Sequence, residues 1–362
     1  MLAMGLMSGT SLDGIDAALI ETDGDGQVRP IAFRGEPYSD AARNQLAAAT
    51  ALSLTFDRPR ASPDLVAAGE LIDRTHAFAV HKLLREAGVA ASDVAVIGYH
   101  GQTVAHRPDR GWTWQIGDGA VLAKATGITV VSDFRSADVA AGGQGAPLLP
   151  VYHGALAAGL DLPVAVLNLG GVANITFIGA DGELVAFDTG PANGLVDSWV
   201  EAETGARYDE GGTLAAAGRV DEAVLTGMLD HPFFELAPPK SLDRNDFTIQ
   251  PARGLTAADG AATLTAFTAA SVNEGVDRLP ARPKRLIVAG GGRHNPTMLR
   301  MIAERTGLVP EASDTLGWNG DAMEAEGFAY MAARTLKGLP ISFPGTTGVG
   351  APLTGGVVHR PA

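Results

Sequence analysis

The chain has 362 residues, of which 46 are glycine, 21 are proline and none is cysteine, and its formal net charge is −14 at pH 7. This length is typical of two domains, each able to bury its own core. The acidic balance disfavours a nucleic-acid partner, and the lack of cysteine excludes disulfides, thiolate metal sites and cysteine nucleophiles. What remains is an α/β protein rich in glycine.

The first seven residues are apolar, but no Lys or Arg precedes them, and a polar run follows at Ser8–Ser11. This pattern does not fit a signal peptide. No uninterrupted apolar stretch reaches the roughly 18 residues that a transmembrane helix needs. We therefore expect a cytoplasmic protein that does not bind membranes.

The first half of the chain predicts three strands followed by two helices. The strands are expected at 2–7, 15–22 and 27–33, because Asp-Gly pairs between apolar runs are a hairpin signal. Helices are expected at 39–54 and from Ser62 to Gly88, the second with a serine N-cap and a proline in its first turn. Short buried strands are expected at 94–97 and 128–131, with the polar groups of 98–104 and 113–119 at strand ends.

The second half repeats the opening pattern about 160 residues later. A strand at 164–169, a glycine turn at 170–173 and strands at 174–178 and 183–187 are expected there. Helices are expected at 194–203, 221–229, 256–276 and 321–337, and a buried strand at 285–289 runs into three glycines. The repeat indicates a duplication, with a chance match as the alternative that the pattern alone leaves open.

Four glycine-rich turns follow apolar strands, at Ser8–Gly14, Gly170–Ala173, Asp188–Asn193 and Gly290–Arg293. Turns without side chains let backbone N–H groups approach phosphate oxygens closely, and Ser and Thr hydroxyls add donors. A single turn of this kind is as readily a plain hairpin, whereas four at strand ends predict a nucleotide held between two half-molecules. The Walker A, G-x-G-x-x-G, G-x-S-x-G and H-E-x-x-H motifs are absent from the sequence.

Three aspartates lie in or beside these turns. Asp13 would repel a phosphate unless a cation intervened, so it is a candidate for Mg²⁺ or a water-mediated contact. Asp188 ends an expected strand, a placement that suits a general base, with a helix N-cap as the alternative. Asp16 is equally well interpreted as a turn-capping residue.

Polar side chains of mixed type also flank the strands of the first half, at 99–103, 115–118, 133–135 and 142–145. Sugar hydroxyls need paired donors and acceptors, so these clusters as a set favour a sugar-like ligand. Taken singly, His100 is more typical of a satisfied structural histidine, and Arg135 could form an ordinary ion pair with Asp133.

The sequence also resembles a known family along nearly its whole length and in the same order. The matching segments are Gly5–Asp16, Gly98–Thr103, Gln115–Asp118, Asp133–Arg135, Gly142–Pro147, Asn168–Asn174, Asp188–Pro191, Gly290–Gly292 with Asn295-Pro296, and Met323–Ala325. They resemble the anhydro-N-acetylmuramic acid kinases, which belong to the sugar kinase, Hsp70 and actin superfamily. The resemblance implies an α/β fold of duplicated ribonuclease-H-like, actin-like ATPase domains with a central nucleotide cleft. We expect a first domain at 1–135, with 341–362 a candidate to complete it, and a second at 136–340.

The resemblance further implies a reaction. ATP and water would convert 1,6-anhydro-N-acetylmuramic acid into N-acetylmuramic acid 6-phosphate and ADP, in peptidoglycan recycling and amino-sugar catabolism. Asp188 matches the family's catalytic aspartate and would activate the water that attacks C1. Mg²⁺ would accompany ATP, with Asp13 reaching it through water and the phosphates, and a homodimer is implied as well.

The site residues follow from the matching motifs. The cofactor-binding residues are Gly9, Thr10, Ser11, Leu12, Asp13, Gly14, Ile15, Asp16, Gly170, Gly171, Asn174, Gly290, Gly291, Gly292 and Asn295. The substrate-binding residues are His100, Gln102, Gln115, Asp118, Asp133, Arg135, Gln144 and Glu324.

Two stretches depart from the family pattern. Ala192 stands where the family often has glycine, so no contact that requires a positive φ is assigned there, and the stretch 240–247 receives no role. The alternatives in function are a kinase for a different amino sugar on the same fold and a nucleotide-switched binding protein.

Overall fold

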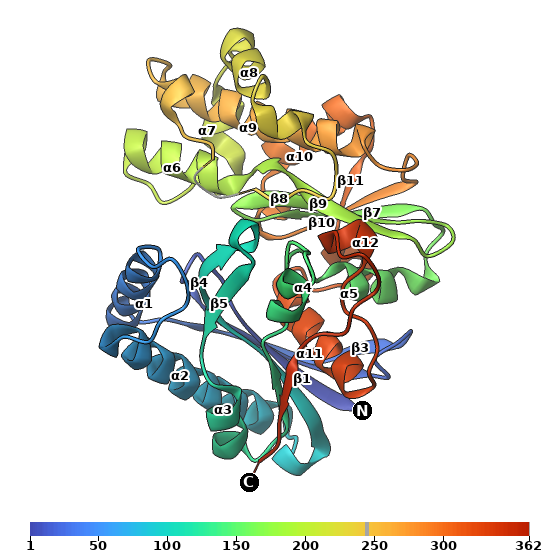
Figure 1. The fold of residues 1–362 in the computed structure, drawn as a ribbon. Coiled ribbons are helices and arrows are strands. Elements are labelled where there is room, and N and C mark those ends of the chain that lie inside the picture. Colours follow the sequence, from blue (N-terminus) through green and yellow to red (C-terminus); the bar gives the residue numbers. More distant parts are fainter. Residues whose placement is uncertain (243–245, 362) are drawn as a thin grey trace. The chain divides into compact units, whose positions relative to one another are not determined.

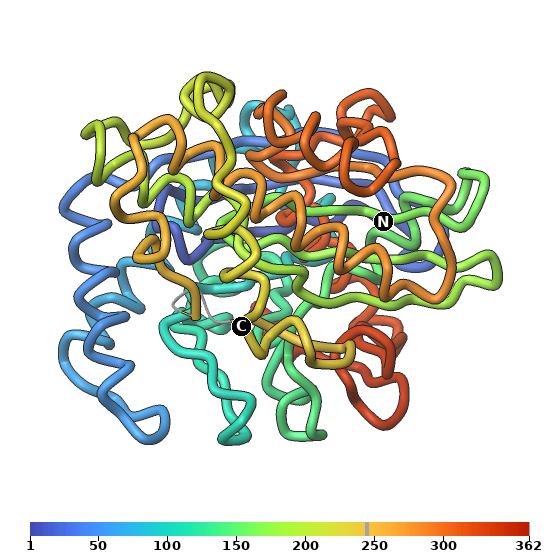
Figure 2. The backbone as a smooth tube through the Cα atoms, turned by 90° about the horizontal axis from the view of Figure 1, so that it is seen from above, coloured from blue at the N-terminus to red at the C-terminus, as the bar shows by residue number. Residues whose placement is uncertain are grey.

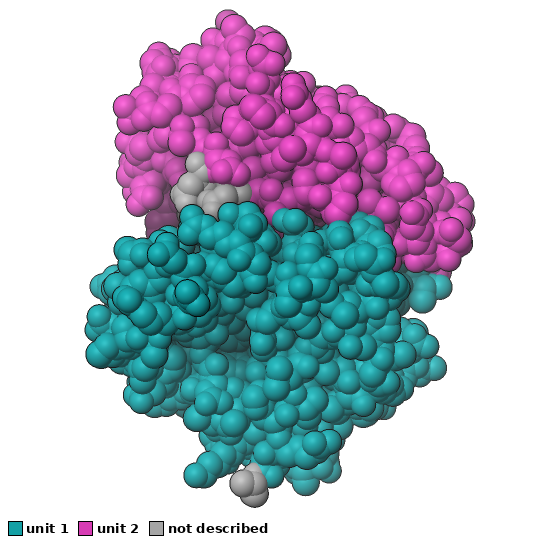
Figure 3. Space-filling view, in the orientation of Figure 1, with its two compact units in different colours: residues 1–158, 322–362 teal, residues 159–321 magenta. Residues whose placement is uncertain are grey.

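The computed structural model describes residues 1–242 and 246–361. The chain divides into two compact units, and Figure 3 colours unit 1 (1–158 and 322–362) teal and unit 2 (159–321) magenta. Unit 1 is therefore built from both ends of the chain, whereas unit 2 is one continuous segment. These bounds differ from the expected division at 135/136 and 340/341, because 136–158 and 322–340 group with the first unit. Among the helices of the described residues, none combines the length and apolar character needed to span a bilayer.

Unit 1 contains a seven-stranded sheet with the spatial order β12-β6-β4-β1-β2-β3, and β5 pairs with β4 (Figure 1). β1 is antiparallel to β2 and parallel to β4, while β2 is antiparallel to β3 and β4 is parallel to β6. The strands are β1 (Leu2–Ser8), β2 (Gly14–Thr22), β3 (Val28–Pro37), β4 (Val94–Arg107), β5 (Trp112–Ile116), β6 (Val130–Ser132) and β12 (Val357–His359).

Helices cover both faces of this sheet. The helices are α1 (Asp40–Ser53), α2 (Pro63–Ala87), α3 (Gly119–Thr126), α4 (Ser136–Ala140), α5 (Pro150–Leu156), α11 (Met323–Leu336) and α12 (Pro344–Thr347). The ends of α2 are as expected: Ser62 accepts a bond from Leu65 N–H, and Gly88 is left-handed. Met4 and Leu6 of β1 share a core with α1 and α2. Because side chains alternate along a strand, Gly5 faces the opposite side, where α11 packs against β1, β2 and β4.

Helix α11 approaches the sheet almost to backbone contact. A Cβ on Gly5 would lie 1.8 Å from the carbonyl oxygen of Ala325, and one on Gly98 would lie 2.0 Å from that of Phe328. Only glycine allows this approach, since any Cβ would overlap the helix backbone. Residues more than 200 positions apart in the chain therefore form one layered unit, and α11 lies beside β1 in Figure 1.

Unit 2 repeats the core topology of unit 1. Its five strands have the order β11-β10-β7-β8-β9, with β7–β8 and β8–β9 antiparallel and β7–β10 and β10–β11 parallel. The order β6-β4-β1-β2-β3 has the same sequence of pairings, so each unit has the ribonuclease-H-like arrangement and the expected duplication is confirmed. The strands are β7 (Val164–Leu169), β8 (Val172–Ile178), β9 (Leu184–Pro191), β10 (Arg285–Ala289) and β11 (Pro310–Ala312).

The core of unit 2 is centred on one helix that is buried along most of its length. This helix is α9 (Ala257–Asp277), with Thr256 as its N-cap, and it packs against β8, β9 and the other helices. Those helices are α6 (Asn193–Thr204), α7 (Thr213–Ala217), α8 (Glu222–Leu229) and α10 (Pro296–Thr306). In the backbone tube of Figure 2, the elements of unit 2 run from green through yellow to orange.

The expectation of a short strand at 94–97 is wrong, because β4 continues to Arg107 and pairs with β5. A β-bulge interrupts its pairing with β1: Leu6 pairs with Tyr99 and Ser8 with Gln102, and Gly101 has φ 68°. Polar side chains in this stretch conceal the strand pattern. Of the stretch 240–247 that received no role, Asp243, Arg244 and Asn245 lie outside the described residues.

Candidate active site

Asp188 lies inside β9, at a β-bulge, and not at the strand end. Asn174 of β8 pairs with Asp188, but the preceding Ala173 pairs with Gly190, so Thr189 is the extra residue. Bulges bend a strand and re-aim its side chains, and they are common next to active sites. The N-cap alternative is excluded, because the N-cap of α6 is Ala192 and no side chain caps this helix. Instead, the Asp188 carboxylate accepts a bond from Leu242 N–H at 2.8 Å.

Three polar side chains form a row across the sheet of unit 2. Asn168 of β7 pairs with Asn174 of β8, which pairs with Asp188 of β9. Directly opposed residues on antiparallel strands present their side chains to the same face. All three are partly exposed, whereas their neighbours toward the strand interior are buried. Sequence reasoning assigned no role to Asn168, although it begins one of the matching motifs.

Burial makes the Asp188 carboxyl group a weaker acid than an aspartate in water. It raises the pKa of Asp188 to about 7, although the bond from Leu242 N–H and the nearby Lys240 ammonium oppose this rise. A carboxyl group with a pKa near 7 is about half ionised at pH 7 and mostly ionised one pH unit higher, and its carboxylate is basic enough to accept a proton. Asp188 therefore meets the electrostatic requirement for a general base.

The glycine turns of unit 2 meet at the same edge of the sheet as this row. Gly290 has φ 74°, and a Cβ there would lie 2.5 Å from Asn168 Oδ1. The N–H groups of Asn193 and Gly194, at the start of α6, donate to the carbonyls of Gly170 and Gly171. The predicted cofactor residues 170, 171 and 290 are thus brought together beside the N-terminus of α6.

The structure also settles the side-chain bond of Asn295 and the backbone angle of Ala192. Asn295 is the N-cap of α10 and accepts a bond from Met298 N–H, so its side chain is already engaged. Ala192 has φ −129°, so this backbone position does not require glycine.

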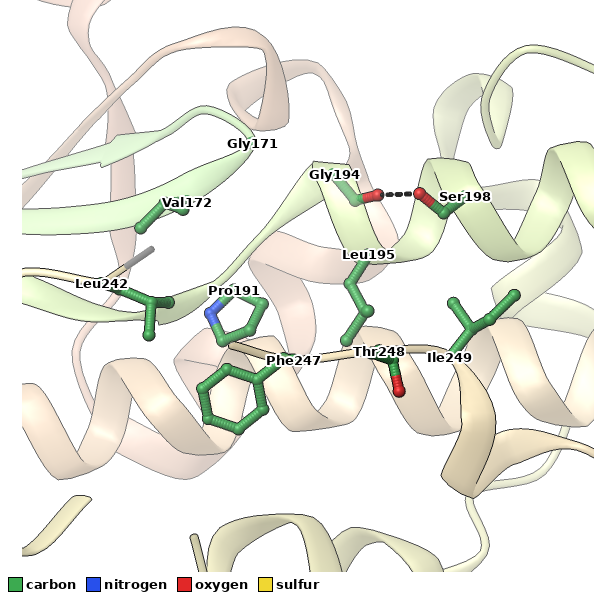
Figure 4. Close-up of a pocket in the computed structure, with 10 residues that line it drawn as sticks. All are labelled: Gly171, Val172, Pro191, Gly194, Leu195, Ser198, Leu242, Phe247, Thr248 and Ile249. Carbon is green, nitrogen blue, oxygen red and sulfur yellow. Dashed lines mark hydrogen bonds between the residues drawn. The ribbon is translucent and has the colours of Figure 1, made fainter. Parts of the chain in front are cut away.

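A pocket of about 460 Å³ opens beside the 170–171 turn and the first turn of α6 (Figure 4). Its walls combine unhindered backbone with apolar side chains, and Ser198 Oγ donates to the carbonyl of Gly194 at 2.8 Å. Leu242 connects this pocket to Asp188, because its side chain lines the pocket and its N–H holds the carboxylate. The lining residues are Gly171, Val172, Pro191, Gly194, Leu195, Ser198, Leu242, Phe247, Thr248 and Ile249.

In unit 1, the turn between β1 and β2 is tightly fixed at its base and open at its tip. Leu12 has φ 58°, a strained value for a non-glycine residue, and its N–H donates to the carbonyl of Gly9 at 3.2 Å. Thr10, Ser11 and Asp13 are exposed, and the Asp13 carboxylate lies 3.7 Å from Arg43 Nη2. The hydroxyls of Thr10 and Ser11 at this tip are thus accessible to a ligand, and the phosphate contact expected of residues 9–16 stays a prediction.

Gln102 fixes the base of this turn. Its Oε1 accepts a bond from Ser8 Oγ at 2.5 Å, and its Nε2 donates to the carbonyls of Gly9 at 3.2 Å and Thr103 at 3.3 Å. Tyr38 OH also contacts Ser8 Oγ, at 2.9 Å. The amide of Gln102 is fully buried and engaged at both ends. The structure thus gives Gln102 a role in holding the turn, which sequence reasoning missed.

Four of the predicted substrate residues line two adjoining pockets of unit 1. His100, Gln115 and Asp133 line one of about 250 Å³, and Gln115 and Asp118 line another of about 560 Å³. The two pockets share Pro59 and the segment 114–117 as a common wall. Gln115 lies on that wall and donates from Nε2 to the hydroxyls of Thr103 and Thr113.

His100, which is buried, and Arg135, which is half-buried, form a hydrogen-bonded pair at the smaller pocket. His100 Nδ1 contacts the carbonyl of Gly101 at 3.0 Å, and Arg135 donates to His100 Nε2 at 3.1–3.2 Å and to the carbonyl of Gly145 at 2.8 Å. Burial, with help from Arg135, holds the pKa of His100 well below its usual range. His100 is therefore neutral and has partners at both ring nitrogens, as a structural histidine would have.

Asp118 and Asp133 also have backbone partners of their own, and Glu324 and Gln144 complete the predicted set. Asp118 is the N-cap of α3 and accepts from Ala120 N–H at 2.8 Å, while Asp133 has φ 55° and accepts from Ser136 N–H at 3.3 Å. Burial raises the pKa of Glu324, at the start of α11, and the Arg135 charge opposes the rise. Gln144 is fixed through its backbone N–H, which donates to the carbonyl of Thr347 at 2.7 Å.

Within residues 1–242 and 246–361, no group of three or more His, Asp or Glu side chains converges to hold a metal ion. Asp13, an exposed carboxylate in the turn between β1 and β2, is the predicted Mg²⁺ contact, and Mg²⁺ in proteins commonly keeps several waters and binds through one or two carboxylates plus substrate phosphates.

Comparisons with known proteins show which family the chain resembles along its whole length. The family model described as anhydro-N-acetylmuramic acid kinase matches residues 1–361. The protein of that name from Rhizorhabdus wittichii is 69% identical over 362 residues, covering 100% of this chain and 99% of the relative. That from Zymomonas mobilis is 53% identical over 363 residues, covering 99% of this chain and 100% of the relative. Component A of the (R)-2-hydroxyglutaryl-CoA dehydratase of Acidaminococcus fermentans shares the fold alone, with a TM-score of 0.50 and 13% identity over 93% of this chain and 99% of that one.

Proposed function

The chain belongs to the anhydro-N-acetylmuramic acid kinase family, and from this premise we propose that it hydrolytically opens 1,6-anhydro-N-acetylmuramic acid and phosphorylates O6 with ATP. The products would be N-acetylmuramic acid 6-phosphate and ADP. The observation that carries the proposal is the partly buried Asp188, a carboxylate with a pKa of about 7 in a row with two amides beside the glycine turns.

The chemistry of the substrate requires a base. The anhydro-sugar has no free 6-hydroxyl, because O6 is bonded to the anomeric carbon. Asp188 would remove a proton from water as the water oxygen attacks C1, and the C1–O6 bond breaks in the same step. O6 then attacks the γ-phosphorus, ADP leaves, and the proton held by Asp188 is released to solvent.

The phosphoryl transfer needs positioning and charge neutralisation more than covalent chemistry from the protein. We assign ATP contacts to residues 9–16 in unit 1 and to the turns at 170–174 and 290–292 in unit 2. Mg²⁺ bound to the ATP phosphates would supply charge neutralisation, and Asp13 is the residue that would hold it through water. We assign the sugar to His100, Gln115, Asp118, Asp133, Arg135 and Glu324, with Gln102 and Gln144 behind them.

We place the enzyme in the cytoplasm, in recycling of cell-wall amino sugars, and we expect it to form a homodimer. The location, the recycling role and the homodimer follow from the family and remain predictions. Analytical ultracentrifugation measures the oligomeric state directly. A kinase for another amino sugar is distinguished by the substrate that the protein consumes.

Two measurements test the function. Incubation with the anhydro-sugar and ATP in ¹⁸O-labelled water should place the label at C1, because water attacks that carbon. The Asp188→Asn variant should bind ATP nearly as well as wild type while turnover falls by roughly 10² or more, as loss of a general base typically causes. Near-normal turnover in the variant would exclude Asp188 as the base. An unconsumed anhydro-sugar, with another sugar phosphorylated, would favour the rival kinase.

A further inference from the structure

The segment 240–242 is bonded to the backbone and to the carboxylate of Asp188. The N–H of Asp188 donates to the carbonyl of Lys240 at 2.9 Å, and the N–H of Leu242 donates to Asp188 Oδ2 at 2.8 Å. One short stretch of chain thus fixes the residue at its main chain and at one carboxylate oxygen. This bond fixes the direction of the carboxylate and, with it, the position that its second oxygen, Oδ1, offers to a reacting group.

Lys240 anchors this segment from inside unit 2. Its side chain is buried, and its Nζ donates to the carbonyl of Phe233 at 2.9 Å. The ammonium also lies 4.1 Å from the ring centre of Phe233 and 5.7 Å from that of Phe234. A ring face attracts a cation, and this attraction is stronger where water is excluded. These contacts therefore hold the Lys240 ammonium at a defined position, and the side chain in turn restrains the backbone of 240–242.

Three charged groups influence this ammonium. Glu274 and Arg278 lie on α9 and at its C-terminal end, and Asp188 lies on β9. Burial and Arg278 lower the pKa of Lys240 to about 8, while Glu274 and Asp188 act in the opposite direction. Arg278 is itself occupied, because it donates to the carbonyl of Phe234 and lies 3.8 Å from Glu274. Lys240 is thus mainly cationic at pH 7, and its positive charge acts on the Asp188 carboxylate.

We propose that Lys240 is a positioning residue for Asp188. Lys240 holds the backbone of 240–242 against the Asp188 carboxylate and stabilises the ionised form of that carboxylate. The inference rests on the proposed function, since it takes Asp188 as the base. It gives a role to a stretch that sequence reasoning left without one. It also explains why a lysine, costly to bury, occupies this position: a neutral side chain could fill the space but could not stabilise the charge.

The test compares the pH dependence of turnover in four full-length proteins: wild type, Lys240→Met, Lys240→Gln and Lys284→Met. Methionine removes both the charge and the donor, whereas glutamine removes the charge and keeps a donor for the Phe233 carbonyl. Lys284 is the matched control, because it lies in the same unit but pairs with Asp161 at the surface. Circular dichroism and ATP binding establish that each variant is folded.

We expect the acid limb of the kcat profile to move upward by roughly 0.5–1 pH unit in both Lys240 variants, because the base loses a neighbouring cation. The plateau value of kcat should fall roughly tenfold in Lys240→Met and less in Lys240→Gln, since a misplaced base reacts more slowly. The KM for ATP should stay unchanged, and Lys284→Met should match wild type throughout.

An acid limb that stays at the wild-type pH in a folded Lys240→Gln protein would overturn the proposal. Failure of both Lys240 variants to fold would also overturn it, by assigning Lys240 to the stability of unit 2. Failure of the proposed function would look different, because wild type would then leave the anhydro-sugar unconsumed or Asp188→Asn would remain active.

Discussion

Asp188 is a residue whose chemistry lowers the stability of the fold. Its folded-state pKa of about 7 lies above the usual value of 3.8. Between these two values the folded protein binds a proton that the unfolded chain has released, so the free energy of unfolding falls as pH rises. The protonated carboxyl is compatible with burial, whereas the carboxylate needed for catalysis is not. The stability contribution is fully present below the unfolded pKa and is lost above about pH 7.

Replacing this carboxyl with an amide should therefore stabilise the protein at alkaline pH. We expect Asp188→Asn to raise the free energy of unfolding at pH 8 by about 2 kcal/mol, a value below the full shift because the side chain keeps some contact with solvent. The gain should shrink at pH 5. Urea unfolding at both pH values measures it, with the exposed Asp181→Asn in the same unit as control. An equal gain at both pH values would contradict the assigned pKa.

At the scale of single elements, the sequence predicts those parts whose signals are local. The expected strands at 164–169 and 285–289 have the observed bounds, because each is a largely apolar run that ends at a glycine. The caps of α2 are confirmed for the same reason. The expected bounds of the strand at 94–97 are wrong, because β4 continues to Arg107. Its polar residues pair with strands distant in the sequence, and a bulge interrupts the pairing with β1. The roles of Gln102 and Lys240 depend on such partners and carry no local signal.

The contact between the sheet and α11 gives a test at this scale. A Cβ on Gly98 would lie 2.0 Å from the carbonyl oxygen of Phe328, which is backbone and cannot rotate away. We expect Gly98→Ala to lower the free energy of unfolding by about 3 kcal/mol, as overpacking of a core does. Thermal or urea unfolding measures the loss.

The control for this test is Gly26→Ala. A Cβ on Gly26 would meet no atom of the described residues within 4 Å, so the effect of this change should stay within about 0.5 kcal/mol. Equal effects of the two changes would contradict the close packing of α11 on the sheet.

At the scale of the whole molecule, the two units share a strand order but differ in how the chain completes them. Unit 2 is continuous, whereas unit 1 needs α11 from beyond residue 321. This helix also brings Glu324 to Arg135 and places the ring of Phe328 4.7 Å from that of His100. The resemblance indicated the duplication, but no local pattern in the sequence predicts that the first unit recruits this helix.

Isolated fragments of the chain should distinguish unit 2, which is continuous, from unit 1, which needs α11. We expect residues 159–321 to fold alone, because their core is complete, and residues 1–158 to lack cooperative unfolding, because one face of their sheet is uncovered. Co-expression of 1–158 with 322–362 should restore the fold of the first unit. Circular dichroism and urea unfolding report on each fragment. Cooperative unfolding of 1–158 alone would refute the role of α11.

The late arrival of α11 has a consequence for biosynthesis. About 180 residues separate the end of the first part of unit 1 from the last turn of α11. At about 5–20 residues per second, the ribosome needs roughly 10–35 s to make them. During this interval unit 2 emerges complete and folds first, while the sheet face that carries Gly5 and Gly98 waits uncovered. We therefore expect residues 1–158 of the nascent chain to be the part most prone to aggregate, for a time that depends on translation speed after residue 158.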